Sequence, residues 1–197
     1  QLVALPEMFS TGFSMAAEKI AEEPGGPAER FLLEQARATG AAVCGTVATR
    51  QTLGRADGTG QGAAEEGRTV ALKPQNLGLL ALPDGQVGRY AKIHPFTFGG
   101  ETERYASGTR SLTMTVAGVR VTLLICYDLR FAELFAALAP RTDLFCVLAN
   151  WPEPRRDHWR TLLKARSIEC LAYVLGVNRV GAGGNLTYAG DSALWAP

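Results

Sequence analysis

Three side chains suited to acid–base or nucleophilic chemistry stand at the ends of apolar, strand-like runs. Glu7 follows the first such run, Lys92 ends a second and Cys126 ends a third. Because α/β proteins place ligands and catalytic groups at the carboxyl ends of their strands, we expect this carboxylate, amine and thiol to meet. A thiol attacks as its thiolate, so a neighbouring base would be needed to make such a cysteine reactive.

Each of these residue types also has a purely structural interpretation. A cysteine in an apolar run is more often an inert core residue, and we assign that role to Cys44, Cys146 and Cys170. A lysine in a hairpin strand is ordinarily a surface residue, and a lone glutamate after a proline is ordinarily solvated. The cysteines form no CxxC pair and the chain has only 2 histidines, so neither a zinc site nor a disulfide framework is expected.

The elements that must position these residues alternate between strands and helices. The predicted strands, apolar throughout or alternating, span residues 2–5, 42–48, 77–82, 86–92, 112–116, 119–126, 143–149, 173–177 and 188–195. The predicted helices span residues 27–39, 131–139 and 156–171, and loops cover 53–67 and 95–108. This alternation, with several strands apolar on both faces, predicts an α/β architecture with covered sheets.

Composition argues against several classes of protein. With 20 Lys and Arg residues against 19 Asp and Glu, the net charge is +1, which gives no support to nucleic-acid binding. No apolar run has the length of a membrane span, and the first residues do not resemble a signal peptide. The isolated cysteines favour a reducing cytoplasm as the location. The chain of 197 residues opens within a strand-like run and stops just after another, so we expect both terminal segments of a longer protein to be absent.

Five short runs, in order along the chain, resemble the nitrilase superfamily of carbon–nitrogen hydrolases. The match is closer to the ω-amidase branch, with its YafV-like and Nit2-like enzymes. The runs are PEMFSTGF (6–13), YAKIHPF (90–96), ICYDLRF (125–131), ANWP (149–152) and GVNRVG (176–181). The resemblance implies one domain over residues 1–197, incomplete at both ends, with the family's four-layer α-β-β-α sandwich. It also implies a homodimer and neither a metal nor an organic cofactor.

The resemblance implies roles for the three strand-end residues. Cys126 would be the nucleophile and Glu7 the general base, which takes the thiol proton and gives it to the departing ammonia. Lys92 would stabilise the oxyanion of the tetrahedral intermediate, together with a backbone N–H that we assign to Tyr127. Water would then hydrolyse the thioester on Cys126.

A second glutamate, which the family uses to position substrate or water, is a fourth catalytic candidate. We assign it to Glu101, because Glu101 lies seven residues before Gly108, which matches the Glu-to-Gly interval in the related amidases. Glu103 is the competing candidate. His94 is expected to hydrogen-bond beside the site, because the resemblance makes the base a carboxylate rather than a histidine.

Other residues near the strand ends are candidates for shaping the pocket. The candidates for substrate binding are Asn150, Trp151, Arg156, Phe96 and Phe13. A substrate carboxylate would need a cation, and Arg156 or its neighbour Arg155 would supply a bidentate one. Solvated positions for both arginines, and core positions for both phenylalanines, remain the structural alternatives. Structural ion pairs are expected for Asp128, Arg130 and Arg166.

The implied activity is hydrolysis of a small-molecule amide. The favoured substrates are short 2-oxo dicarboxylic acid monoamides, such as 2-oxoglutaramate or 2-oxosuccinamate, which would give the 2-oxo acid and ammonia. Within the superfamily, the alternative is a hydrolase of N-carbamoyl amines or of nitriles with the same catalytic residues. The alternative from another class is a catalytically silent scaffold that binds a partner, against which the intact set of Glu7, Lys92 and Cys126 argues.

Overall fold

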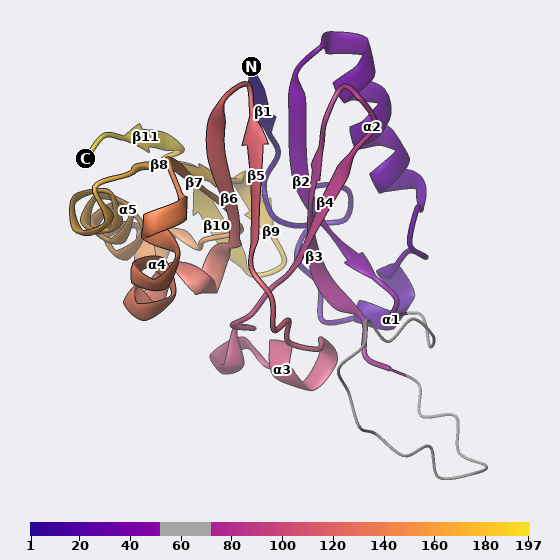
Figure 1. Ribbon diagram of the computed structural model, residues 1–197. Coiled ribbons are helices and arrows are strands. Elements are labelled where there is room, and N and C mark those ends of the chain that lie inside the picture. The colour runs from indigo at the N-terminus through magenta and orange to yellow at the C-terminus, as the bar shows by residue number, and fades with distance from the viewer. Residues whose placement is uncertain (52–71) are drawn as a thin grey trace, which may run out of the picture.

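Two β-sheets packed face to face form the centre of the protein (Figure 1). The computed structural model describes residues 1–51 and 72–197, so the loop expected over 53–67 lies outside the described residues. The first sheet contains, in spatial order, β1 (Leu2–Ala4), β2 (Ala42–Thr49), β3 (Gln75–Ala81) and β4 (Val87–Ala91). The second contains, in spatial order, β11 (Ala193–Trp195), β8 (Tyr173–Asn178), β7 (Leu144–Ala149), β6 (Val119–Ile125) and β5 (Leu112–Val116).

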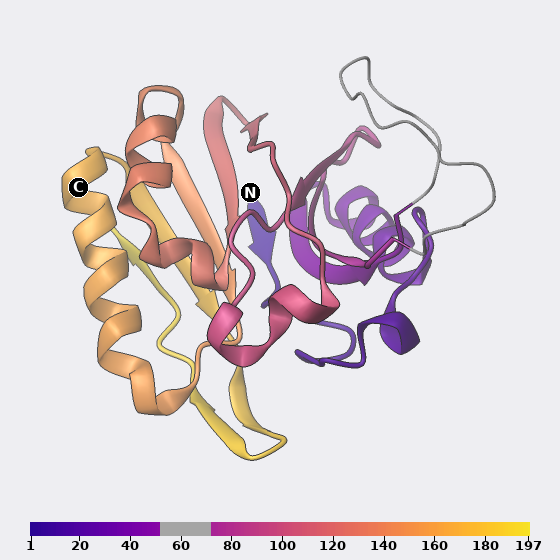
Figure 2. The same ribbon diagram turned by 90° about the horizontal axis from the view of Figure 1, so that it is seen from below.

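Helices cover the outer faces of both sheets (Figure 2). Helix α2 (Pro27–Thr39) lies on the first sheet, whereas α4 (Ala132–Leu138) and α5 (Arg156–Cys170) lie on the second. The order helix, sheet, sheet, helix confirms the predicted four-layer sandwich. The shorter helices are α1 (Ala17–Ile20), α3 (Glu101–Arg104) and the 3₁₀ helices η1 (Thr97–Gly99), η2 (Cys126–Arg130), η3 (Ala139–Arg141) and η4 (Glu153–Arg155). Among the described helices, none combines the length and apolar character needed to cross a membrane.

The direction of the strands brings the motif residues that follow them to one edge of the sandwich. In the second sheet, β6, β7 and β8 run parallel to one another, and antiparallel β5 and β11 flank them. In the first sheet, β1 pairs parallel with β2, and two antiparallel pairings then return β4 to the same direction. Parallel strands are buried on both faces, which explains why β7 is apolar throughout.

The main core lies between the two sheets. Leu80 from the first sheet and Leu123 from the second are both completely buried, a state worth about 1.5–3 kcal/mol for each side chain. Cys44 and Cys146 face each other across the same layer with their sulfur atoms 3.9 Å apart, and both are free thiols. These two cysteines are therefore core residues, as predicted, while Cys170 is partly buried.

Helix α2 shows how the sequence sets the limits of an outer-layer helix. Pro27 occupies its first turn, where the missing N–H would have no helical partner. Gly40 ends it in the left-handed conformation, with φ at 66°. Leu32 and Ala36 lie between these ends and are buried against β2 and β3. The predicted span of this helix, residues 27–39, is confirmed.

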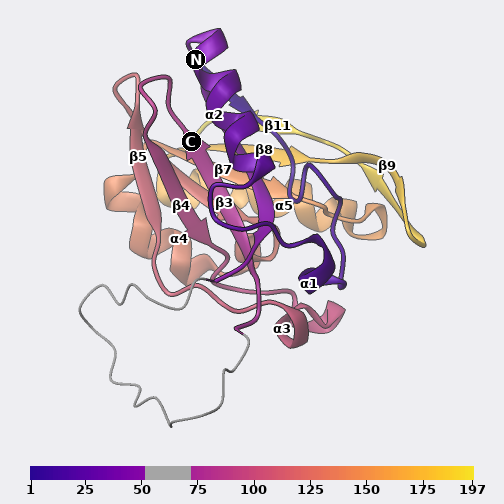
Figure 3. The same cartoon turned by 90° about the vertical axis from the view of Figure 1, so that its right-hand side faces the viewer.

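Two regions differ from the prediction. The expected loop over residues 95–108 contains η1 and α3, which are too short to give a periodic signal. The single strand expected over residues 188–195 is two strands, because the chain breaks at Gly190, whose φ is 75°. The first of them, β10 (Leu186–Ala189), forms a hairpin with β9 (Val180–Gly183) that extends beyond the sheets (Figure 3).

Candidate active site

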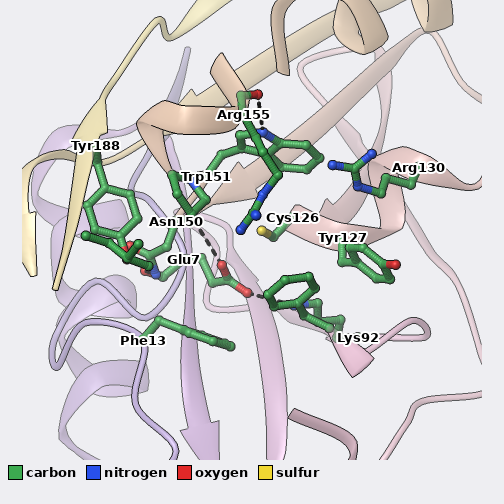
Figure 4. A pocket seen from close by; sticks show the side chains of 13 residues that line it. Glu7, Phe13, Lys92, Cys126, Tyr127, Arg130, Asn150, Trp151, Arg155 and Tyr188 are labelled. Atoms are coloured by element: carbon green, nitrogen blue, oxygen red, sulfur yellow. Dashed lines mark hydrogen bonds and ion pairs between the residues drawn. The ribbon is translucent and has the colours of Figure 1, made fainter. Parts of the chain in front are cut away.

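One cavity collects residues from the ends of strands in both sheets. Glu7 and Lys92 follow β1 and β4 of the first sheet, and Cys126 and Asn150 follow β6 and β7 of the second. Figure 4 shows the carboxylate of Glu7 and the sulfur of Cys126 turned toward the same space. The cavity has a volume of about 80 Å³, so it suits a small substrate. Its lining residues are Glu7, Phe13, Lys92, Phe96, Cys126, Tyr127, Arg130, Asn150, Trp151, Pro152, Arg155, Leu186 and Tyr188.

Cys126 stands at a sharp turn between strand β6 and helix η2. Its φ is 46°, in the left-handed region that side chains other than glycine seldom adopt. Such strained positions cluster at functional sites, where the surrounding structure holds them in place. The turn also makes Tyr127 one of the first residues of η2, so the backbone N–H of Tyr127 has no acceptor within that helix.

The Glu7 carboxylate is held by three donors. Its Oε1 accepts hydrogen bonds from Asn76 Nδ2 at 2.8 Å and from Lys92 Nζ at 3.0 Å. Its Oε2 accepts one from the backbone N–H of Asn150 at 2.9 Å, and the Asn150 side chain donates to the Glu7 carbonyl. Because Glu7 is only 1% exposed, these contacts determine the direction in which its carboxylate points.

Lys92 is a buried cation between two carboxylates. Its Nζ lies 3.0 Å from Glu7 Oε1 and 2.8 Å from Glu101 Oε2, and all three side chains are at most 1% exposed. Burial alone lowers the pKa of the Lys92 ammonium, but the charges of Glu7 and Glu101 outweigh burial and raise that pKa. Lys92 therefore carries a permanent positive charge in the cavity.

The thiol of Cys126 is protonated in the resting site. Burial raises its pKa well above the ordinary value, and the negative charge of Glu7 raises it further. The positive charge of Lys92 acts in the opposite direction. A thiol in this environment must lose its proton to a neighbouring base as it attacks, and Glu7 is the carboxylate that lines the cavity.

The structure distinguishes the two candidates for the second glutamate. Glu101 is completely buried and bonds to Lys92, Asn76 and the backbone N–H of Phe96, whereas Glu103 is exposed. Glu101 reaches the site through Lys92 and does not itself line the cavity.

Gly108 matters because it approaches the Lys92 strand closely. Its backbone N–H donates to the Lys92 carbonyl at 2.8 Å. A Cβ at Gly108 would lie 2.1 Å from the carbonyl oxygen of Ala91, which the backbone could not accommodate without moving. The absence of a side chain at Gly108 therefore helps to position Lys92.

His94 hydrogen-bonds beside the site, as expected, and does not line the cavity. Its backbone N–H donates to Asp128 Oδ1 at 2.9 Å, and its ring Nδ1 lies 3.0 Å from the same oxygen. The hydroxyl of Tyr90 donates to Asp128 Oδ2 at 2.7 Å. Asp128 therefore braces the turn that carries Cys126, since it also accepts the Ile125 backbone N–H.

Two of the arginines, Arg156 and Arg130, lie in other places than predicted. Arg156 pairs with Asp191 on the surface and does not line the cavity, so the structure does not bring it together with the other candidate residues. The neighbouring Arg155 lines the cavity instead, and so does Arg130, which was expected to form a structural ion pair. Arg166 does form its expected pair, with Glu169 at 2.8 Å.

Aromatic side chains form much of the cavity wall. Phe13, Phe96 and Trp151 lie there as expected, and Trp151 is held by Asn178, which accepts its backbone N–H at 2.7 Å. Tyr188, which lies in β10 of the hairpin β9–β10, was predicted to begin a strand but not to line the cavity. Within the described residues, no group of three or more His, Cys, Asp or Glu side chains could hold a metal ion.

Comparison with known protein sequences finds relatives over the whole chain. The carbon-nitrogen hydrolase family profile matches residues 1–197. The omega-amidase YafV of Escherichia coli (strain K12) is 35% identical over 199 residues, which cover 100% of this chain and 69% of the relative. The 2-oxoglutaramate amidase of Bacillus subtilis (strain 168) is 30% identical over 200 residues, with 100% and 70% coverage.

Solved structures show the same fold. A CN-hydrolase superfamily protein from Xanthomonas campestris, whose crystal structure has an arsenic adduct in the active site, is 40% identical with a TM-score of 0.82. The match covers 98% of this chain and 69% of that one. An amidase from Nesterenkonia sp. is 24% identical with a TM-score of 0.78, over 100% of this chain and 70% of its own, and supports the fold alone.

Proposed function

Because the chain belongs to the carbon–nitrogen hydrolase family, as an enzyme that hydrolyses amides, we propose that its substrates are short 2-oxo dicarboxylic acid monoamides. 2-Oxoglutaramate and 2-oxosuccinamate are the favoured examples, and each would give a 2-oxo acid and ammonia. The names of the relatives at 30% to 35% identity support this choice.

The pair of arginines at the cavity is the observation that carries the proposal. Among the described residues, neither Arg130 nor Arg155 forms an ion pair with a carboxylate. Both line the cavity that contains the thiol of Cys126 (Figure 4). A guanidinium binds a carboxylate through two parallel hydrogen bonds, so these side chains suit a substrate that is anionic at the end opposite its amide.

The first half of the reaction forms a thioester. Cys126 Sγ attacks the amide carbon while Glu7 takes the thiol proton, and the carbonyl oxygen becomes an oxyanion. Lys92 Nζ and the backbone N–H of Tyr127 stabilise that oxyanion. As the carbon–nitrogen bond breaks, Glu7 returns the proton to the nitrogen, which leaves as ammonia. Glu101 orients Lys92 throughout, because it holds the same ammonium from the other side.

The second half releases the acid. Water attacks the thioester carbon while Glu7 takes a proton from it, and the same oxyanion donors stabilise the second tetrahedral intermediate. The carbon–sulfur bond then breaks, the 2-oxo dicarboxylic acid leaves, and Cys126 regains its proton from Glu7. These steps need no metal and no organic cofactor.

The remaining expectations belong to the same proposal. The enzyme works in the cytoplasm as a homodimer, and residues 1–197 form a single hydrolase domain. Gel filtration with light scattering tests the dimer, and fractionation of the source cells tests the location.

Ammonia release from a substrate panel tests the proposed function. The panel contains 2-oxoglutaramate, 2-oxosuccinamate, glutamine, a simple nitrile and an N-carbamoyl amine. The protein is compared with its Cys126→Ala variant and, as a matched control, with Cys170→Ala, because Cys170 is a free cysteine away from the cavity.

Turnover of the 2-oxo amides that is lost only in Cys126→Ala supports the proposal. Turnover of the nitrile or the N-carbamoyl amine alone would keep the nucleophile but refute the substrate. If the whole panel is inert, alkylation of Cys126 by iodoacetamide no faster than that of the buried Cys44 would favour the silent scaffold.

A further inference from the structure

Arg130 lies between the catalytic cavity and a second hollow on the surface. It lines the cavity on one side, and on the other it lines the hollow together with Asp157, His158, Thr161 and Leu162. An arginine side chain has several rotatable bonds and solvates readily, so its position at such a boundary depends on the groups that restrain it.

Three contacts restrain the guanidinium of Arg130. Its Cζ lies 5.0 Å from the ring centroid of Trp151 and 5.9 Å from that of Tyr127. Its Nη2 lies 3.1 Å from Nδ1 of His158, on helix α5. The aromatic faces attract the cation without fixing its rotation, whereas a hydrogen bond has direction. Figure 4 shows the result, with the guanidinium beside Trp151 and above Tyr127.

The contact with His158 determines which group donates the hydrogen bond and which accepts it. A guanidinium has only donors, so His158 Nδ1 must be the acceptor and the imidazole must carry its proton on Nε2. This bond uses Nη2 and leaves the other nitrogens of Arg130 available. Asp157 lines the same outer hollow, and its carboxylate is the group that would draw a released guanidinium outward.

We propose that His158 is a positioning residue for substrate binding: its Nδ1 accepts a hydrogen bond from Arg130 and so keeps the guanidinium at the cavity, where it binds the carboxylate of the substrate. This inference rests on the proposed function, because only an anionic substrate needs Arg130. Without the acceptor, Arg130 turns toward Asp157 and the cavity loses a preorganised cation. Loss of this hydrogen bond therefore weakens substrate binding rather than the chemical steps, since His158 contacts no reacting atom.

Steady-state kinetics of three α5 variants test the proposal. His158→Leu removes the acceptor, and His158→Asn keeps one, because the Asn amide oxygen can take the place of Nδ1. Lys164→Leu is the control for an exposed polar residue on the same helix. The substrates are 2-oxoglutaramate and the uncharged butyramide.

We expect His158→Leu to raise KM for 2-oxoglutaramate about three- to tenfold, equivalent to about 0.7–1.4 kcal/mol, with little change in kcat. KM for butyramide should not change. His158→Asn should restore most of the affinity for 2-oxoglutaramate, and Lys164→Leu should match the unmodified protein with both amides. Equal effects of His158→Leu on both amides would overturn the proposal, as would an unchanged KM or a failure of His158→Asn to restore it.

Failure of the proposed function can be distinguished from failure of the inference about His158. An unmodified protein that hydrolyses butyramide but not 2-oxoglutaramate refutes the proposed function. The inference about His158 is then decided by inhibition of butyramide hydrolysis by 2-oxoglutarate, which offers Arg130 the same carboxylate. A higher inhibition constant in His158→Leu supports the inference, whereas equal inhibition in both proteins, or none, overturns it.

Discussion

Replacing Glu7 by Gln should make the Cys126 thiol more acidic, although it removes the base proposed for amide hydrolysis. The Glu7 charge is one of the causes that raise the pKa of Cys126, and the Lys92 charge is the one that opposes them. Glu7→Gln removes the anion and keeps the cation, because Lys92 still pairs with Glu101 at 2.8 Å. The pKa of Cys126 should therefore fall.

Burial of Cys126, which is the largest cause of its raised pKa, is unchanged by the substitution, whereas the charge of Glu7, which raises that pKa further, is removed. Lys92 remains and still acts to lower the pKa. At a pH below the pKa, the thiolate fraction of Cys126 is therefore larger in Glu7→Gln than in the unmodified protein. Amide hydrolysis should nevertheless fall by about 10²–10⁴, because no base takes the thiol proton or protonates the leaving nitrogen.

Alkylation by iodoacetamide across a pH series measures this change. Mass spectrometry separates modification of Cys126 from that of Cys170, which is the other partly buried thiol. Glu133→Gln is the matched control, because it removes a carboxylate that is exposed on α4.

The expected result is a hydrolytically inactive Glu7→Gln variant whose alkylation profile moves to lower pH, with no movement in Glu133→Gln. A profile that stays in place or moves to higher pH would refute the electrostatic reasoning. An equal movement in both variants would show that the effect does not come from the contact between Glu7 and the thiol.

Three further substitutions test the surroundings of the lysine. Lys92→Met should lower kcat about 10²–10³ through loss of an oxyanion donor, measured in single-turnover assays, and a normal kcat would contradict that role. Glu101→Gln should lower the unfolding free energy measured in urea by about 2 kcal/mol, because it removes one of the two carboxylates bound to Lys92 while Glu7 still pairs with the ammonium; an unchanged stability would show that the contact with Glu101 is dispensable. Gly108→Ala should lower kcat while leaving the far-ultraviolet circular dichroism unchanged, because its Cβ displaces the Ala91 carbonyl next to Lys92; normal activity would show that this backbone can move without harm.

The convergence of Glu7, Lys92 and Cys126 could be predicted because α/β folds place ligands and catalytic groups at the carboxyl ends of their strands. The apolar runs identified the strands, and the motifs placed a reactive group just after each of them. In the first sheet, β1 and β4 run in the same direction, so Glu7 and Lys92 lie at the same edge, and Cys126 after β6 lines the same cavity. The four-layer order followed from the family resemblance rather than from the pattern of single elements.

The choice between Arg155 and Arg156 could not be predicted from the sequence. Adjacent residues at the start of a helix point about 100° apart, so one faces the cavity while the other faces away. Which of them does so depends on Asp191, which lies 35 positions away and captures Arg156. Position along the chain gives no indication of such a contact.

Residues supplied by weakly patterned segments were also missed. Tyr188 comes from a hairpin with two short strands, and its neighbour Leu186 lines the same wall. Asn76, which donates hydrogen bonds to both Glu7 and Glu101, had one available signal: it is a polar residue at the start of β3, directly before the apolar residues of that strand. A buried amide of this kind requires partners, and here they are the two carboxylates of the site.

Because the proposed base and nucleophile come from different sheets, the packing between the sheets sets the distance across which a proton would move. Glu7 and Lys92 follow strands of the first sheet and Cys126 follows a strand of the second, and contacts such as that between Cys44 and Cys146 join the two sheets in the core. A cavity or an extra methyl group in that layer would change the alignment of base and nucleophile without touching either residue. Substitutions in the interior of the sandwich should therefore change activity as well as stability, even where they lie far from the cavity.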